Sequence, residues 1–511
     1  MQQESRVKKS LLNARVNLIF YFLTLALSFF SRKTFLDCLG AEFIGLTGTV
    51  GNLLGLLNLA ESGVGAAIAV VLYAPLFERN EQKIKEIVSV LGYLYSTIGK
   101  IILAGGGLLA CFIPLIFPNS ELGLPIIYFT FFSFLGSSLI GYFINYRQVL
   151  LSADQRNYVV AAYSQSANVL KILLQMALAY YTGNYVVWVL VEFSFGILYS
   201  IILNWKIKQV YPWLVTEIKK GKALCREYPD VMRNTKQLFI HKIGSVVYTQ
   251  VTPFLVYAYA SLQAVAYYGN YILVTSKLSS LLANFLGGTN ASVGNLIAEG
   301  DKDKILKVYW ELMSIRFLFV SIVVFALYHL LPPFIALWLG EEYVMSQALL
   351  VLVLISFALG IIRGVTEEFL LGYGLFSDVW APFAEAAILV VVAVIGGTLW
   401  GLEGTLLGGI VSSVIIIYVW KPYFLFTKGL QISVWKYWKE FGKYILTVAI
   451  SFYMARMLLE NIPMEFAIYA DWIDWILYAG ILVVLFVIVV GTALFLTTQG
   501  TRNLCYRLIK R

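Results

Sequence analysis

The sequence is poor in charge. Lys, Arg, Asp and Glu together make up 13% of the 511 residues, against roughly 25% in an average soluble domain. Hydrophobic residues reach 60%. This balance excludes an ordinary soluble globular fold and indicates a protein that lies in a lipid bilayer.

Cysteine and histidine are also scarce. The two histidines, His241 and His329, support neither a metal centre nor a catalytic triad. The four cysteines are scattered, without the pairing of a disulfide framework or the spacing of zinc ligands: Cys38, Cys111, Cys225 and Cys505. We therefore expect no metal and no cofactor.

Motifs for nucleotide hydrolysis and glycosyl transfer are missing as well. Gly99 and Lys100 lack the upstream glycine of a phosphate-binding loop and are followed by Ile101, so we expect no ATP hydrolysis. The acids Asp301 and Asp303 lie in a short charged turn, where solvated loop residues are the simpler interpretation. We predict a protein that is not an enzyme and has no nucleic acid partner.

Apolar runs predict an all-α integral membrane fold with about fourteen transmembrane helices. Spans of about 20 residues repeated that often use roughly 280 residues, so only short connections remain. The first run precedes Ser31, Arg32 and Lys33 rather than a small-residue cleavage site, which indicates a retained helix and not a signal peptide. The predicted spans are 13–31, 42–76, 85–115, 123–151, 158–182, 184–206, 236–262, 267–297, 305–330, 346–371, 378–398, 402–422, 442–460 and 472–498.

Positive charge is unevenly distributed over the connections between these spans. With a cytoplasmic N-terminus, the inner connections hold most of the Lys and Arg, whereas outer segments such as 116–125 and 331–343 hold none. The positive-inside rule then predicts that both termini are cytoplasmic. Arg32 and Lys33 are exceptions, but most of the net charge of +9 is explained by this topology.

The longest predicted cytoplasmic connection, about residues 205–237, is basic and contains Pro212 and Pro229, which indicates a linker between two halves. Sliding the two halves over each other aligns helix ends and superimposes Gly48 on Gly269. We therefore predict two six-helix lobes, related by a pseudo-twofold axis along the membrane normal, and two further helices. The predicted parts are an N-lobe at 1–206, a basic linker at 207–235, a C-lobe at 236–424, and helices thirteen and fourteen with a cytoplasmic tail at 425–511.

Polar residues follow one face of several predicted spans, and these faces carry cations. A charge at the centre of a span costs about 2.5–3.5 kcal/mol on insertion scales, so it should face protein or water. We interpret the faces as walls of one aqueous cavity for an anionic substrate. The cations are Arg32, Lys171, Lys242, Lys277 and Arg363. The polar residues are Asn17, Thr24, Ser28, Asn168, Gln175, Thr249, Asn270 and Asn284.

Another interpretation of these faces stays open. Polar stripes also join helices through hydrogen bonds, and Lys and Arg can extend to a membrane interface. This interpretation is the better one for Lys100, Arg316 and Arg456, which lack a polar face. Arg363 and Glu367, four residues apart, can also pair with each other.

Glu61 is the acid most suited to a functional role. It lies among Gly51, Gly55 and Gly65, small residues that allow a backbone or a substrate to come close. We predict that Glu61 binds a coupling cation or proton, or else pairs with a buried cation. The other acids inside predicted spans are Glu192, Glu311 and Glu385.

The segment from Arg32 to Lys85 contains a pattern of leucines, glycines and acids. Its residues are Arg32, then Leu39, Gly40, Glu42, Gly45 and Leu46, then Leu59, Ala60, Glu61, Gly63 and Gly65, then Pro75 and Leu76. This pattern resembles the bacterial lipid-linked oligosaccharide flippases (Wzx-like), the polysaccharide transporter branch of the multidrug/oligosaccharidyl-lipid/polysaccharide superfamily. The segment "ASVGNLIAEGDKDKI" from Ala291 resembles the corresponding part of the second half. Predicted helices ten to fourteen match no motif.

The resemblance implies a substrate, a polyprenyl-pyrophosphate-linked oligosaccharide repeat unit. A flippase would carry it across the bacterial inner membrane for O-antigen, capsule or exopolysaccharide biosynthesis. The resemblance implies substrate contact by Arg32 and, more loosely, by Lys171, Lys242 and Lys277, and coupling to Na⁺ or H⁺ through Glu61. Membrane lipid, a glycan polymerase and a chain-length regulator are the implied partners.

Two other functions remain as alternatives. A cation-coupled multidrug antiporter of the same superfamily would carry organic cations in an acid-dominated, aromatic cavity, and the basic faces argue against it. A membrane glycan polymerase would present a sizeable outer loop for catalysis, whereas the predicted outer loops are short.

Overall fold

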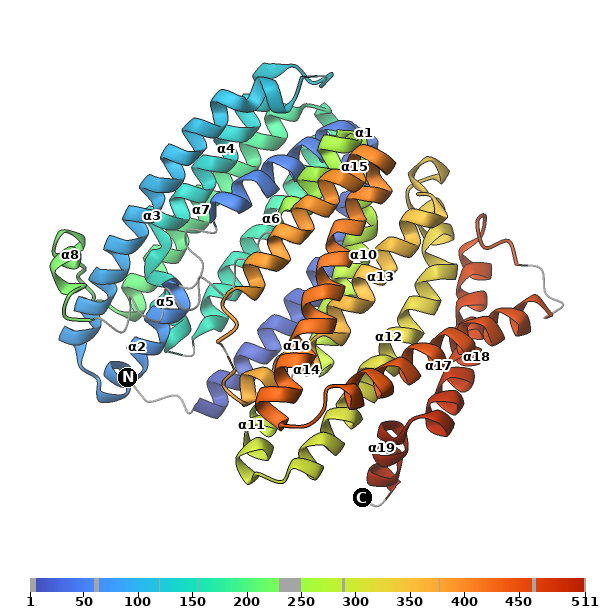
Figure 1. Ribbon diagram of the computed structural model, residues 1–511. Coiled ribbons are helices and arrows are strands. Elements are labelled where there is room, and N and C mark those ends of the chain that lie inside the picture. The colour runs from blue at the N-terminus through green and yellow to red at the C-terminus, as the bar shows by residue number, and fades with distance from the viewer. Residues whose placement is uncertain are drawn as a thin grey trace. The chain divides into compact units, whose positions relative to one another are not determined.

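The computed structural model describes residues 6–58, 64–118, 120–154, 156–228, 250–286, 290–375, 377–461 and 466–509. All regular elements in these ranges are helices, and none is a strand. Among the same residues, nine helices are long and apolar enough to cross a membrane. The predicted all-α membrane fold is thereby confirmed (Figure 1).

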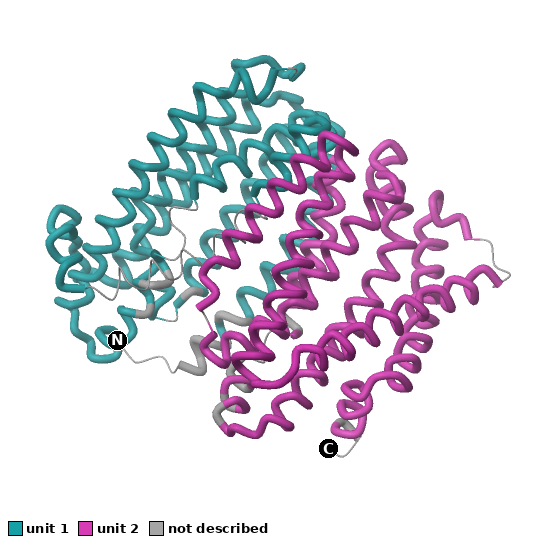
Figure 2. The backbone as a smooth tube through the Cα atoms, in the orientation of Figure 1, with its two compact units in different colours: residues 1–266 teal, residues 267–511 magenta. Residues whose placement is uncertain are grey.

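The chain divides into two compact units, unit 1 at Met1–Ala266 and unit 2 at Tyr267–Arg511 (Figure 2). Residues 250–259 of unit 1 are helical, and α10 (Leu262–Leu286) starts in unit 1 and continues in unit 2. The predicted lobe boundaries stay predictions. The other elements of unit 1 are α1 (Arg6–Leu57), α2 (Val64–Glu78), α3 (Glu81–Ile116), α4 (Leu124–Phe143), η2 (Asn145–Arg147), α5 (Gln148–Ala153), α6 (Asn157–Thr182), α7 (Tyr185–Val210), η3 (Ile218–Lys220) and α8 (Gly221–Leu224).

Unit 2 contains long helices joined by short turns. Its elements after α10 are α11 (Asn290–Glu299), α12 (Lys302–Trp338), η5 (Glu341–Tyr343), α13 (Gln347–Ile362), α14 (Gly364–Gly372), α15 (Ala381–Ser413), η6 (Val414–Trp420), α16 (Lys421–Phe424), η7 (Leu425–Leu430), α17 (Trp435–Glu460), α18 (Trp472–Thr497) and α19 (Gln499–Ile509). The segments η6 and η7 are π-helical turns.

Glycines interrupt two long helices where the sequence predicts a gap between spans. Gly40 in α1 has φ 79° and ψ 160°, and Gly401 in α15 has φ 58° and ψ −129°. Positive φ angles are accessible to glycine at little cost, because it has no Cβ. Both α1 and α15 therefore contain two helical segments separated by a sharp bend.

The two arms of α15 contact each other through glycine backbones. A Cβ at Gly404 would lie 1.9 Å from the Gly396 carbonyl oxygen, and one at Gly408 would lie 2.6 Å from the Leu389 carbonyl oxygen. Small residues allow membrane helices to approach this closely, and van der Waals contact then holds them together. The arms form a tight helical hairpin.

The helices α6 and α10 are outside the set of nine apolar spans. They carry two of the predicted polar faces, with Asn168, Lys171 and Gln175 in α6 and Asn270 and Lys277 in α10. Polar residues in a membrane helix need protein or water around them. We therefore expect the polar faces of α6 and α10 to meet protein or water, although both helices also have exposed apolar side chains.

Aromatic side chains form much of the core of unit 2. Phe325 of α12 stacks on Phe486 of α18 at a centroid distance of 4.0 Å, and Phe317 stacks on Tyr444 of α17 at 4.9 Å. Stacked rings add about 0.5–1.5 kcal/mol beyond the burial of their area. By contrast, Ile488 on α18 is 62% exposed, as expected of a surface that meets lipid rather than water.

Candidate functional site

A cation, an amide and a carboxylate meet between α6 and α7 in unit 1. The Lys171 Nζ lies 2.7 Å from the Glu192 Oε1. Gln175 Nε2 donates to the Glu192 Oε2 at 3.0 Å and to the Trp188 carbonyl oxygen at 3.2 Å. Lys171 and Gln175 are four residues apart, so one helical face directs both side chains at the same acid.

The pair of Lys171 and Glu192 is only partly shielded. Their side chains are 18% and 26% exposed. The pairing neutralises a lysine that would otherwise be costly inside a membrane span.

Arg32 stands at the end of the first polar face. Its Nη2 donates to the Ala266 carbonyl oxygen at 2.7 Å, within unit 1. The Ser28 and Thr24 hydroxyls donate to carbonyl oxygens of their own helix, which is the usual arrangement for such residues in a membrane helix. Asn17, on the same face, is exposed.

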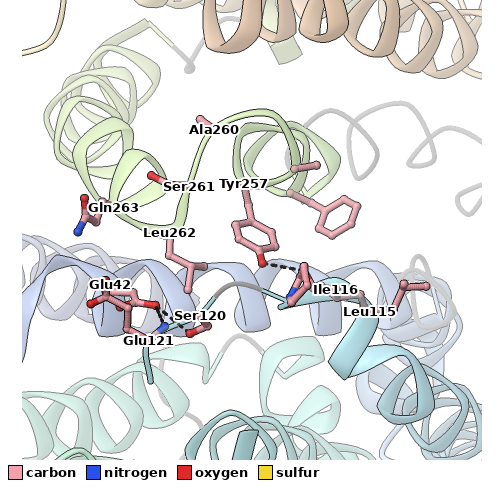
Figure 3. Close-up of a pocket in the computed structure, with 13 residues that line it drawn as sticks. Glu42, Leu115, Ile116, Ser120, Glu121, Tyr257, Ala260, Ser261, Leu262 and Gln263 are labelled. Atoms are coloured by element: carbon pink, nitrogen blue, oxygen red, sulfur yellow. Dashed lines mark hydrogen bonds between the residues drawn. The ribbon is translucent and has the colours of Figure 1, made fainter. Parts of the chain in front are cut away.

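A cavity of about 580 Å³ opens between α1, the end of α3 and residues 254–263 (Figure 3). Glu42 Oε1 accepts hydrogen bonds at 2.8 Å from the Ser120 hydroxyl and from the Glu121 backbone N–H. Tyr257 donates to the Ile116 carbonyl oxygen at 2.7 Å. Two glutamates line this cavity, and its described lining contains no Lys or Arg.

Unit 2 contains a larger charged network around Arg363. Arg363 lies 2.7 Å from Glu367 through Nη2 and 3.7 Å from Glu385 through Nη1. The pairing with Glu367, four residues away, was one of the two interpretations open from the sequence. Glu385 is 6% exposed and belongs to α15, so the network joins two spans.

Arg316 of α12 extends this network to a third span. Arg316 pairs with Glu368, and both side chains are 11% exposed. Its Nη1 also donates to the Ile361 carbonyl oxygen at 2.8 Å, close to the point where α13 gives way to α14. Gly364 provides the space, because a Cβ there would lie 2.3 Å from that Nη1.

Two arginines and three glutamates gather in this part of unit 2. Arg316, Glu367 and Glu368 line a cavity of about 340 Å³. Arg363 and Glu385 join this group through the ion pairs of Arg363. Lys421 lies 2.7 Å from the buried Asp378.

The other predicted site residues differ in burial. Asn270 is fully buried, whereas Lys277 and Asn168 are partly exposed. The side chain of Asn284 is outside the described part of the chain. Lys242, Thr249 and Glu61 also lie outside the described residues, so their roles stay predictions.

Sequence reasoning missed the partners of the cations more often than the cations themselves. Glu192 was visible as an acid inside a span, but nothing in the sequence links it to Lys171. Arg316 has no polar face, which favoured an interfacial side chain, yet it contacts Glu368 and a helix carbonyl. A cross-helix partner leaves no periodic signal along one helix, so only the fold shows it.

Comparisons with known proteins show which solved structures have a similar fold. No protein family model matches the chain, and no curated protein matches it in sequence. The structure is similar to that of the lipid II flippase MurJ in an inward closed conformation, with a TM-score of 0.65, 14% identity, and coverage of 95% of this chain and 99% of that one.

Two structures described as a multidrug resistance MATE family transporter of the MOP superfamily are also similar. The match to an inward-facing MATE family transporter has a TM-score of 0.60 and 14% identity, and covers 81% of this chain and 97% of the other. The match to an outward-facing conformation has a TM-score of 0.52 and 15% identity. It covers 82% of this chain and 94% of the other. The chain thus has the transporter fold shared by the lipid II flippase and the multidrug transporters of the MOP superfamily.

Proposed function

We propose that this protein is a flippase for polyprenyl-pyrophosphate-linked oligosaccharide repeat units, which it carries across the bacterial inner membrane for surface polysaccharide biosynthesis. The observation that carries the proposal is the pairing of Lys171 with Glu192 on a polar face inside a transporter fold. The similarity to the lipid II flippase covers 95% of the chain, against 81% for the inward-facing multidrug transporter. This favours a flippase over a drug transporter.

Glu192 has a specific role in this proposal. An unpaired lysine inside the bilayer is costly, so Glu192 neutralises Lys171 while the site is empty. Pyrophosphate carries more charge than a carboxylate and offers several acceptor oxygens for charge-assisted hydrogen bonds. It therefore displaces Glu192 from Lys171, and Gln175 keeps the released carboxylate in a hydrogen bond.

Coupling to an ion gradient supplies the direction of transport. Glu61 is one proposed coupling residue, from its place among small residues. The network of unit 2 is a second acid-rich place, because Glu385 shares Arg363 with Glu367. A proton or Na⁺ would bind at Glu385 there.

The proposed cellular setting follows from the charge distribution and the resemblance. Both termini are cytoplasmic, and the substrate enters from the cytoplasmic leaflet. A glycan polymerase and a chain-length regulator would act on the translocated repeat units.

A multidrug antiporter is the second candidate function. The cavity around Glu42 and Glu121 favours it, because two carboxylates and no Lys or Arg in the described lining suit an organic cation. The similarity to two multidrug transporter conformations gives the same candidate.

The test replaces Lys171 and Lys277 by Ala, singly, in the producing bacterium. We expect surface glycan to be lost and lipid-linked repeat units to accumulate, because the substrate would lose its cationic contacts. Lys219→Ala is the control, since Lys219 is an exposed lysine of η3. Unchanged glycan together with altered sensitivity to cationic drugs would instead support the antiporter.

A further inference from the structure

A second cavity, of about 550 Å³, lies in unit 2 at the start of three helices. The α12 side chains that line it are Lys307 and Trp310, and Gln499 and Asn503 come from α19. From α17 come Lys436 and Lys439. None of these residues belongs to the charged clusters proposed to handle substrate or ions.

The floor and one wall of this cavity are held firmly in place. Trp310 stacks on Tyr437 and on Tyr444, with centroid distances of 6.0 and 5.8 Å. α19 packs closely on α12, since a Cβ at Gly500 would lie 2.4 Å from the Trp310 carbonyl oxygen. The cavity is therefore shaped before any ligand arrives.

A further contact anchors the far end of α19. Arg507 lies 2.7 Å from Glu311, a buried acid of α12 whose side chain is 4% exposed. With Gly500 at one end and Arg507 at the other, α19 is fixed to α12 along its length. Gln499 and Asn503 are thus presented on a fixed wall.

The charges in the cavity favour an anion. Within the described part of the chain, Lys307, Lys436 and Lys439 form no ion pair, whereas the lining acid Glu440 lies 2.6 Å from Lys443. Asp303 is the remaining lining acid. Three lysines therefore line a cavity whose two acids are Glu440, which pairs with Lys443, and Asp303.

Two tryptophans set the depth of the cavity. Trp435 is 69% exposed on the first turn of α17, and Trp438 lies against it with a centroid distance of 6.1 Å. Exposed tryptophans at the end of a span mark the headgroup level of a bilayer. The neighbouring lysines Lys436 and Lys439 lie on the same turns and so at the same level.

We propose that this cavity binds the phosphate headgroup of an anionic phospholipid of the surrounding leaflet. Lysine ammonium groups are donors for phosphate oxygens. The amides of Gln499 and Asn503 supply hydrogen bonds for a glycerol headgroup. Basic pockets between membrane helices on the cytoplasmic side are suited to such lipids, which is the side that the charge distribution predicts for these helix ends.

The test measures retention of phosphatidylglycerol on the full-length protein by native mass spectrometry after purification in detergent. The variant K307Q/K436Q/K439Q should lose retention by about fivefold for each lysine removed. The control removes three exposed cytoplasmic lysines of unit 1, and it should retain the lipid like the unaltered protein: Lys208→Gln, Lys219→Gln and Lys222→Gln. The variant K307R/K436R/K439R keeps the three positive charges and should still bind the lipid. Its binding would show that substitution at these positions does not by itself disrupt the fold.

The remaining outcomes would overturn the proposal. Equal phosphatidylglycerol retention by the glutamine variant would show that the lysines do not hold the lipid. Equal retention of phosphatidylcholine would show that headgroup charge is not recognised. Displacement of the lipid by millimolar inorganic phosphate would assign the cavity to a soluble anion. Because retention is measured without transport, each result is independent of the proposed flippase activity.

Discussion

Lys171 in unit 1 meets one carboxylate, Glu192, whereas in unit 2 Arg316 meets Glu368 and Arg363 meets Glu367 and Glu385. The pair in unit 1 is balanced and partly open, with side chains 18% and 26% exposed. The pair of Arg316 and Glu368 is more shielded, with both side chains 11% exposed. We therefore expect substrate binding at the open pair, and helix packing or ion coupling at the shielded network.

The largest effect should come from neutralising the balanced pair without leaving a charge behind. The double variant K171M/E192Q should remain folded, because no unpaired ion is left in the membrane. Transport should nevertheless fall by about tenfold or more, since a hydrogen bond to a charged group is worth about 1.5–3 kcal/mol. Accumulated lipid-linked repeat units, measured by mass spectrometry, report this loss.

E192Q alone is the matched control for this prediction. It leaves Lys171 charged, so substrate binding should persist although the empty site is less stable. Normal transport in the double variant would contradict this prediction. The pair of Lys171 and Glu192 would then have a structural role, like the pair of Arg316 and Glu368 in unit 2.

In unit 2, removal of one arginine should act on stability rather than on transport. Arg316→Met removes the guanidinium that pairs with Glu368 and donates to the Ile361 carbonyl oxygen. We expect the free energy of unfolding to fall by about 3–5 kcal/mol, as for other broken buried pairs. Thermal unfolding of the purified protein in detergent measures this as a lower Tm.

Two further variants sharpen the interpretation. R316M/E368L should recover most of the lost Tm, because two apolar side chains replace the pair without an unpaired charge. Arg456→Ala should leave Tm unchanged, since Arg456 and Glu460 are 62% and 60% exposed. A Tm of R316M equal to that of the unaltered protein would show that Arg316 does not hold the spans together.

The smallest effect should follow from neutralising Glu385. Glu385→Gln keeps the size of the side chain and should shift the Na⁺ or pH dependence of transport by about fivefold or more, the lower end of usual coupling between two sites. Glu61→Gln is the comparator for the other proposed coupling site. If only Glu61→Gln changes the ion dependence, unit 2 has no coupling role.

The helices were more predictable than the clusters. Hydrophobic runs predict the helical class, and the bends at Gly40 and Gly401 fall where the runs separate. The predicted count of about fourteen spans stays a prediction, since nine helices of the described residues are long and apolar enough to cross a membrane. On α6, Lys171 and Gln175 contact the same acid, Glu192. These features depend on residues close together in sequence, where periodicity is informative.

Contacts between helices were not predictable in the same way. Glu192 lies 21 residues from Lys171, and Glu368 lies 52 residues from Arg316. Each pairing depends on which helices become neighbours and at what height, which no single-helix pattern encodes. The acidic cavity around Glu42 was missed for the same reason, because it combines α1 with loops from two other parts of unit 1.

The glycine contacts within α15 have a consequence for how the protein is made. The bend at Trp400 and Gly401 is short, and the arms on either side touch at Gly396 and Gly404. Two spans that pack through their own backbones can associate as soon as both have left the ribosome, before other helices are available. We therefore expect residues 381–430 to enter the bilayer as one preassembled insertion unit during biogenesis.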